Sequence, residues 1–430
     1  MFKALERQGP HDVRGRLAAM RAGLLVVLTI AAVSAMSQER AAPGEDPRVA
    51  AAIASVHATE PTTIGDQVRL CEVPAPPFGE RARAALVRDL LHAAGLTNVR
   101  LDREGNVVGV RPGRSARPNV VLAAHLDTVF PAGTNVKVTR DGALLRGPGI
   151  GDNCRGLAVL VAVARALAKA GVETEGSITF VATVGEEGLG DLRGVKALFA
   201  ETLTGRVDRF VAIDGSGGSI TNVGAGSRRY RVTFRGSGGH SYDNFGRASP
   251  AYALGRALAR ISEIQVPSSP KTTFNVGRIG GGTSVNAIPE ESWMEVDLRS
   301  SDQASLDALD RAFHEIVRQA AALEKPRSNQ SGVITVKSER IGDRSPGRTD
   351  ERSPIVQTAL SVSKALEMAA PLGSGSSDAN VPMQLGIPAI AIGAGGRSTG
   401  THSLQETFDS TGSSRGTARA LLLAIALSRR

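Results

Sequence analysis

Short apolar runs alternate with amphipathic stretches through the first half of the chain. Apolar runs of strand length predict β-strands at residues 99–101, 106–111, 119–124, 177–184 and 209–213. Apolar residues at helical spacing predict helices at residues 47–57, 63–71, 80–94 and 157–170. Because strands alternate with helices, we expect an α/β fold in which helices cover both faces of one sheet.

The pattern changes between residues 229 and 344. Strands are predicted at 230–234, 272–279, 291–298 and 332–338, and helices at 249–264 and 305–323. This β-α-β-β-α-β order is typical of a ferredoxin-like domain, whose edge strand could pair with a second copy. The α/β pattern then returns, with elements at 353–368, 387–392 and 412–428. We therefore expect one domain in two parts, residues 38–228 and 345–430, interrupted by an inserted domain, residues 229–344.

The N-terminal residues 1–37 have the layout of a secretory signal peptide. Basic residues precede an uncharged apolar run at 22–33, and small residues follow at 34–37. The run is short for a membrane span, although an uncleaved anchor is the alternative. We expect the folded chain to be periplasmic or secreted, with no membrane contact beyond this segment.

Composition supports a globular protein and argues against a nucleic-acid partner. The 430 residues are too many for one ordinary core, and they are 41% hydrophobic and 22% charged. The net charge of +9 comes from scattered basic residues without an aromatic platform, which indicates a solvated surface. Cys71 and Cys154 are too few for a disulfide scaffold; in an oxidising compartment they could pair, and free thiols are equally compatible with the sequence.

Acidic residues and a histidine follow the predicted central strands. His125 and Asp127 are two residues apart, so they point the same way, and the carboxylate can hold the imidazole while its other nitrogen binds a metal. The strands that follow lead into Glu186-Glu187 and Asp214, and Asp152 comes from a Gly-rich loop before a helix. These groups should meet at the carboxyl edge of the sheet.

Carboxylates gathered at one edge repel one another unless cations lie among them. Imidazole and carboxylate ligands without thiolate suit a catalytic zinc site, with manganese or cobalt less favoured. Each signal is ordinary by itself, since Asp-Gly and Glu-Glu are common turn sequences. Their recurrence at successive strand ends predicts a metal site.

Nine sequence pieces resemble the dizinc exopeptidase family that includes peptidase T, bacterial glutamate carboxypeptidase and the aminoacylases. They occur in the family's order and cover most of the chain after residue 37. The pieces are His125-Leu-Asp127-Thr-Val, Gly-Ile-Gly-Asp152-Asn, Gly-Glu186-Glu187-Gly, Ile-Asp214-Gly, Gly239-His240-Ser241, Gly280-Gly-Gly-Thr-Ser-Val-Asn286-Ala-Ile-Pro, Asp297-Leu-Arg299, Ser376-Ser-Asp378-Ala-Asn380 and Gly400-Thr-His402-Ser.

The resemblance implies a zinc-exopeptidase-like three-layer catalytic domain with an inserted ferredoxin-like lid that forms a homodimer. It also implies two Zn²⁺ ions, with Co²⁺ or Mn²⁺ possible, bridged by Asp152. One ion would be bound by His125 and Asp214, and the other by Glu187 and His402. Asp127 would orient His125, and Glu186 would be the general base for the water between the ions.

Further residues are implied to act on the substrate. His240 would donate to the developing oxyanion in the partner subunit's site, whereas without the resemblance it is a surface-loop histidine. For Arg299 the alternative is a salt bridge with Asp297 or Asp302. The implied substrate contacts are Asn286, Arg299 and Ser376.

Two positions depart from the family pattern. Cys154 stands where relatives usually have Met or Lys, and its thiol could ligate metal, pair with Cys71 or pack. Asp214 fills a position where Asp goes more with aminopeptidases and dipeptidases, and Glu with carboxypeptidases and deacylases. We therefore expect an exopeptidase for short peptides. The alternatives are an N-acyl-amino-acid deacylase or carboxypeptidase with the same site, and a non-catalytic peptide-binding homologue, against which Glu186 argues.

Overall fold

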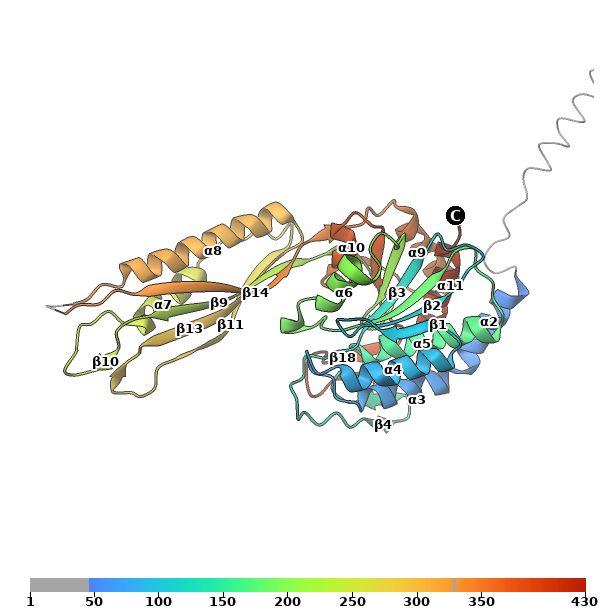
Figure 1. Ribbon diagram of the computed structural model, residues 1–430, viewed down its shortest axis with the longest axis horizontal. Helices are drawn as coiled ribbons and strands as arrows, with labels where there is room; N and C mark the ends of the chain where they lie inside the picture. The colour runs from blue at the N-terminus through green and yellow to red at the C-terminus, as the bar shows by residue number, and fades with distance from the viewer. Residues whose placement is uncertain (1–45, 328–329) are drawn as a thin grey trace, which may run out of the picture. The chain divides into compact units, whose positions relative to one another are not determined.

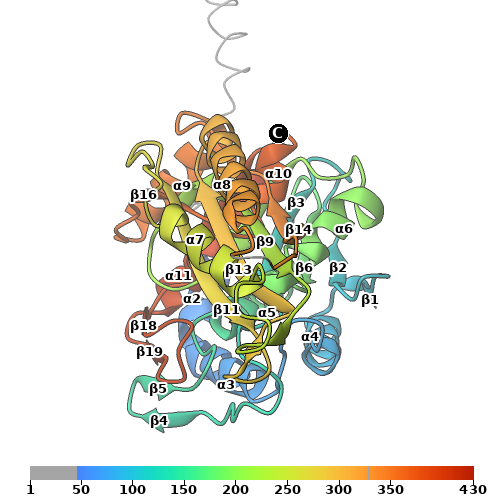
Figure 2. The ribbon, with the colours of Figure 1, turned by 90° about the vertical axis from the view of Figure 1, so that its left-hand side faces the viewer.

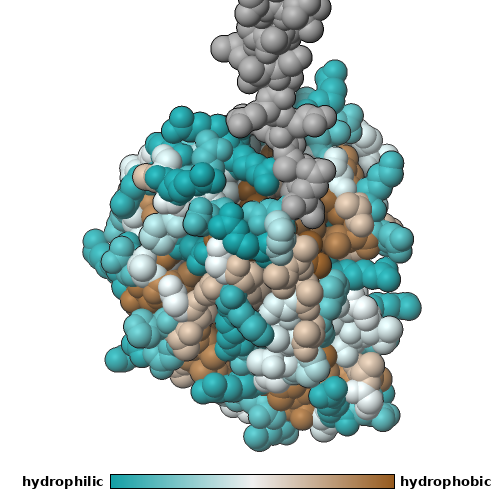
Figure 3. All heavy atoms as spheres, turned by 90° about the vertical axis from the view of Figure 1, so that its right-hand side faces the viewer, coloured by the Kyte–Doolittle hydropathy of each residue, from teal (hydrophilic) through white to brown (hydrophobic). Residues whose placement is uncertain are grey.

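The computed structural model describes residues 46–327 and 330–430. The predicted signal peptide, residues 1–37, lies outside these ranges. Within them, every helix is too short or too polar to cross a membrane. On the face shown in Figure 3, hydrophobic residues are scattered among hydrophilic ones.

A nine-stranded sheet forms the centre of the larger part of the fold (Figure 1). Its order is β1-β2-β6-β3-β7-β17-β8-β15, with β16 also paired to β8. The central pairs β6–β3, β3–β7 and β7–β17 are parallel, so these strands end at the same edge. The strands are β1 (Thr97–Leu101), β2 (Val107–Arg111), β3 (Val120–His125), β6 (Ile178–Thr183), β7 (Arg209–Ile213), β8 (Ile220–Gly224), β15 (Gly347–Arg348), β16 (Leu372–Gly375) and β17 (Ala389–Ile392).

Helices cover both faces of this sheet, as predicted. On β3, Val120 and Leu122 belong to one buried cluster and Val121 to another, so successive side chains pack on opposite faces. The larger cluster includes residues of α2 (Pro47–Ala58), α3 (Glu60–Cys71), α4 (Arg81–Ala93), α5 (Cys154–Lys169), α9 (Pro354–Ala365) and α11 (Ser414–Leu427). The smaller includes residues of α6 (Arg193–Ala197), η2 (Leu198–Thr202) and α10 (Asn380–Gln384). A short 3₁₀ helix, η1 (Gly188–Gly190), precedes α6.

The sequence did not predict a second small sheet, of order β18-β19-β5-β4. Its strands are β4 (Thr139–Asp141), β5 (Leu144–Arg146), β18 (Arg397–Thr399) and β19 (Thr407–Asp409). Pairing of β5 with β19 brings the loop after β5 beside the loop between β18 and β19. The first loop carries Asp152 and the second carries His402, so this sheet joins two parts of the predicted metal site.

Residues 226–344, here called the inserted domain, fold around their own core. The sheet order is β11-β13-β9-β14, all antiparallel, and α7 and α8 pack on one face of it (Figure 2), which confirms the ferredoxin-like prediction. In β13 buried residues alternate with partly exposed ones. The elements are β9 (Gly226–Arg235), α7 (Pro250–Ile261), β11 (Thr272–Gly281), β13 (Glu291–Ser300), α8 (Gln303–Leu323) and β14 (Thr335–Arg344), with a short β10–β12 pair of Gly239–His240 and Ala287–Ile288. The exact domain boundaries stay a prediction.

The Gly/Ser-rich stretch that holds Ser376 lies between two regular elements. Residues up to Gly375 form β16, parallel to β8, and α10 begins at Asn380. Gly and Ser have low strand propensity, but the exposed edge of β8 supplies the hydrogen bonds that β16 needs.

Candidate active site

His125 ends β3 with its imidazole between two sets of oxygen atoms. Its Nδ1 lies 3.1 Å from the backbone oxygen of Asp127 and 3.6 Å from that residue's carboxylate. Its Nε2 lies 3.0 Å from Asp152 and 3.7 Å from Asp214. Asp127 therefore contacts one ring nitrogen, through its carbonyl more closely than through its carboxylate, while the other nitrogen faces two candidate ligands. This is the arrangement of a metal-binding histidine.

The two carboxylate oxygens of Asp152 face different histidines. Oδ1 lies 3.0 Å from His125, and Oδ2 lies 3.3 Å from Nε2 of His402. His402 is also 2.9 Å from Oε1 of Glu187. Among the described residues, three groups of possible ligand atoms result, each within 4.8 Å: His125/Asp152/Asp214, Asp152/Glu187/His402 and His125/Glu186/Glu187. Asp152 belongs to the first two groups, which is the position a bridging carboxylate needs.

Proton affinities in this cluster reflect its crowded carboxylates. Hydrogen bonds with Asp152 and Glu187 raise the pKa of His402 to about 10. Burial opposes the charged form of His125, but hydrogen bonds with neighbouring carboxylates raise its pKa well above the ordinary value. Burial and the charge of Asp152 raise the pKa of Asp214. The cluster thus attracts positive charge, and its imidazole and carboxylate donors fit zinc, cobalt or manganese.

Glu186 lies beside this cluster and is buried, with 5% of its surface exposed. Burial, together with the charge of Glu187, raises its pKa well above the ordinary value, while Arg344 opposes that rise. Arg344 Nη1 is 3.0 Å from Glu186 Oε1. A buried carboxylate of raised proton affinity is suited to accept a proton during catalysis.

Several residues that hold the site together were not predicted. Buried Glu406, four residues after His402, accepts the backbone N–H groups of Gly149, Gly151 and Asp152 at 3.0, 2.8 and 3.1 Å. This carboxylate ties the His402 loop to the Asp152 loop. Its sequence signal is weak, since an acid in a polar loop is ordinary.

Asn153 and Gly156 fix the start of α5 against β7. The Asn153 side chain caps the helix by accepting the N–H of Gly156 at 3.1 Å and donates to the backbone oxygen of Ile213 at 2.9 Å. A Cβ on Gly156 would lie 2.5 Å from that same oxygen. The position of Asn153 just before an apolar helix is a sequence signal for an N-cap. Its hydrogen bond to Ile213 of β7, next to Asp214, depends on the tertiary fold and carries no such signal.

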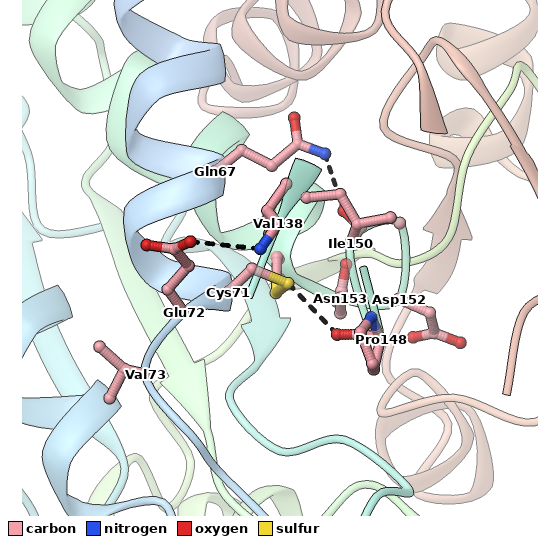
Figure 4. Close-up of a disulfide and its surroundings, with 12 residues drawn as sticks. Gln67, Cys71, Glu72, Val73, Val138, Pro148, Ile150, Asp152 and Asn153 are labelled. Atoms are coloured by element: carbon pink, nitrogen blue, oxygen red, sulfur yellow. Dashed lines mark hydrogen bonds between the residues drawn. A yellow bond between two sulfur atoms is a disulfide. The ribbon is translucent and has the colours of Figure 1, made fainter. Parts of the chain in front are cut away.

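Cys71 and Cys154 form a disulfide (Figure 4). The sequence left metal ligation, pairing and packing open for Cys154, and the structure shows pairing. It joins the last residue of α3 to the first residue of α5, with Cα atoms 5.4 Å apart. Figure 4 shows the carboxylate of Asp152 pointing away from the sulfurs. The side chain of Gln67 on α3 also donates to the backbone oxygen of Ile150 at 2.7 Å. The Asp152 loop is thus attached to α3 at two points.

The predicted substrate residues lie in different places. His240 and Asn286 line one cavity of the inserted domain, where the imidazole of His240 lies 3.3 Å from the carboxylate of Asp243. Arg299 pairs with Asp297 at 2.6 Å, which is the alternative noted for it. Ser376 accepts from Arg344 at 2.9 Å and so lies near Glu186. The structure brings together the six predicted metal-site and base residues with Asp127 and Ser376, and the roles of all these residues stay predictions.

The fold and site define a class first: an α/β protein whose parallel strands end in a cluster of carboxylates and imidazoles that could hold metal ions. Residues 121–426 match the model of Peptidase family M20/M25/M40, and the chain belongs to this family. Its class of reaction is metal-dependent hydrolysis of amide or peptide bonds.

Individual similarities are moderate in sequence and extensive in fold. The succinyl-diaminopimelate desuccinylase of Corynebacterium glutamicum is 25% identical over 345 residues, which cover 77% of this chain and 89% of that one. A tripeptidase from Staphylococcus aureus has a similar fold, with a TM-score of 0.72 at 22% identity, covering 86% of this chain and 99% of that one. A dinuclear metal-binding M20 peptidase of Bacillus subtilis gives 0.62 at 17% identity, with coverage of 86% and 99%.

Proposed function

We propose that the protein is a dizinc exopeptidase that hydrolyses short peptides. The position of Asp152 between two histidine-containing groups is the observation that carries this proposal. His125, Asp152 and Asp214 would hold one ion, and Asp152, Glu187 and His402 the other. Zinc at these positions supplies Lewis acidity for water and for the scissile carbonyl.

Glu186 moves the proton in this proposal. Its carboxylate takes a proton from the attacking water, whose oxygen bonds to the carbonyl carbon. It then gives the proton to the leaving nitrogen as the C–N bond breaks, so that a carboxylate and an amine result. His240 and Asn286, on the inserted domain, would contact the carbonyl oxygen and the substrate, His240 in the partner subunit's site.

The second candidate is an N-acyl-amino-acid amidohydrolase, because one relative is a succinyl-diaminopimelate desuccinylase. Di- and tripeptides with free amino groups should be compared with N-acetyl and N-succinyl amino acids, using zinc-loaded protein. We expect cleavage of the peptides; cleavage of the acylated amino acids alone would replace the first candidate with the second. Release from the amino or carboxyl end, read by mass spectrometry, separates aminopeptidase from carboxypeptidase action.

A non-catalytic role is tested with Glu186→Gln. This variant should bind two zinc ions per chain but lose turnover by about 10²- to 10⁴-fold, the usual contribution of a general base. Full activity in the variant would remove Glu186 from this role. Binding of peptides by wild-type protein without any cleavage would instead favour the peptide-binding homologue.

We also propose that the chain is exported and forms homodimers through the inserted domain. Strand β11 supports pairing, because it lies at the edge of its sheet with several exposed residues. Light scattering should give twice the chain mass, and expression of the full chain in a bacterium should place the processed protein outside the cytoplasm. A monomer, or protein retained in the cytoplasm, would contradict the respective part of this proposal.

A further inference from the structure

Arg344 connects the inserted domain directly to Glu186. It is the last residue of β14, opposite Ser227 on β9, and only 3% of its surface is exposed. Its Nη1 lies 3.0 Å from Glu186 Oε1 and donates to Ser376 Oγ at 2.9 Å. Its Nη2 donates to the backbone oxygen of Glu186. The guanidinium therefore contacts both the side chain and the main chain of Glu186.

The neighbouring residues fasten the end of β14 to the segment that follows Glu186. The backbone N–H of Asp343 lies 3.0 Å from each carboxylate oxygen of Asp191. Lys196 donates to Asp191 at 2.6 Å and to the backbone oxygen of Asp343 at 2.8 Å. From β9, Arg229 donates to the backbone oxygen of Gly188. Contacts from both strands thus converge on residues 186–196.

These contacts leave Arg344 poorly placed to bind a substrate carboxylate. Both terminal nitrogens already donate to Glu186 or Ser376, and Nε, which makes no hydrogen bond among the described residues, lies 3.8 Å from Oδ1 of Asp191. Recognition of a carboxylate by arginine uses two parallel donors on an accessible side of the guanidinium. A buried guanidinium that already donates to Glu186 and Ser376 acts on those protein groups instead.

We propose that Arg344 is a positioning residue that holds Oε1 of Glu186 and leaves Oε2 directed to the water, so that the general base is oriented by the inserted domain. This inference rests on the proposed function of Glu186. A base that is misplaced by about 1 Å loses much of its rate advantage, although substrate binding is retained.

The test compares Arg344→Met, Arg344→Lys and the control Arg340→Met. Arg340 lies on the same strand, contacts Asp343 and Tyr230, and carries the same charge. We expect Arg344→Met to lower kcat by about 10- to 100-fold with KM within about threefold, Arg344→Lys to be intermediate, and the control to stay within about twofold. A rise in KM at unchanged kcat would identify Arg344 as a substrate anchor and overturn the proposal.

A double variant separates positioning of Glu186 from general structural damage. In a Glu186→Gln background, Arg344→Met should lower kcat by less than about twofold further, because both changes affect one function. Multiplying losses would contradict the proposal. Arg344→Lys gives the same test if the methionine variant does not fold.

Crystal structures of zinc-loaded wild-type protein and Arg344→Met supply a readout that does not depend on turnover. We expect the Glu186 carboxylate to turn away in the variant with both zinc ions retained; an unmoved carboxylate would overturn the proposal. If wild-type protein cleaves none of the tested amides, the proposed function fails, while this comparison still decides whether Arg344 positions Glu186.

Discussion

The carboxylate of Asp127 accepts the backbone N–H of Glu187 at 2.8 Å. The backbone carbonyl of Asp127 lies 3.1 Å from the ring of His125, and its carboxylate also accepts the N–H of Glu186 at 2.9 Å. One fully buried residue thus contacts a candidate ligand from each metal group and the candidate base. Its effect extends beyond the orientation of His125 that the sequence implied.

Replacing Asp127 by Asn should weaken both metal sites. The amide offers one acceptor oxygen where the carboxylate offers two, so one buried N–H of the Glu186-Glu187 turn loses its partner. We expect metal affinity to fall by about 10- to 100-fold. Competition with a chelator measures this, with Asp141→Asn on exposed β4 as the control. Unchanged retention of both ions would show that the turn keeps its geometry without Asp127.

Removing the disulfide should destabilise the fold. Cys71 and Cys154 are 83 residues apart in sequence, and the chain-entropy model gives about 4–5 kcal/mol for a loop of this length. The double variant Cys71→Ser/Cys154→Ser should show this decrease in the free energy of unfolding by urea, compared with oxidised wild type. Wild type unfolded with a reductant is the control and should match the variant. A difference below about 1 kcal/mol between variant and oxidised wild type would contradict the expected effect.

Glu406→Gln should loosen the Asp152 loop. The Glu406 carboxylate now accepts three backbone N–H groups. In glutamine an NH₂ group replaces one carboxylate oxygen, so at least one of these buried N–H groups loses its acceptor. We expect a loss of about 1–3 kcal/mol in stability and faster zinc release. Thermal unfolding and zinc transfer to a dye measure these effects, with exposed Glu263→Gln as the control. If zinc release stays at the wild-type rate, Glu406 contributes to stability alone.

The metal-free protein should lose stability as pH rises above neutrality. The pKa of His402 rises from 6.5 to about 10 through its contacts with Asp152 and Glu187. Between these values the folded protein holds a proton that the unfolded chain has released. Stabilisation is therefore complete below pH 6.5 and lost as pH approaches about 10.

Thermal unfolding of chelator-treated protein should show this decrease in stability with pH. The measurement should run between pH 6.5 and 9.5, about the range in which the proton is lost. His402→Asn should make the decrease smaller but not abolish it, because the pKa of His125 is raised as well. His92→Asn, on the exposed side of α4, is the control and should leave the decrease as it is. Zinc-loaded protein should lack this decrease, because metal ligands bind deprotonated. A decrease of equal size in wild type and His402→Asn would show that His402 carries no extra proton in the folded state.

Much of the fold and the core of the site follow from local patterns. The apolar runs of β3, β6 and β7 predicted parallel strands, and parallel strands place His125, Glu186 and Asp214 at one edge. His402 was assigned from the family resemblance; its approach to Asp152 depends on three-residue strands that carry no periodic signal. Arg344 could not be predicted, because its pairing with Glu186 spans 158 residues and a lone arginine after a strand usually indicates a solvated surface.

The two ends of the inserted domain have a consequence for where a chemical change in one part of the chain is felt in the other. Ser227 and Arg344 face each other on adjacent strands, so the polypeptide departs and returns at practically one point. Arg344 lies at that point and donates to Glu186, so any rearrangement of the strand ends there acts directly on the candidate base.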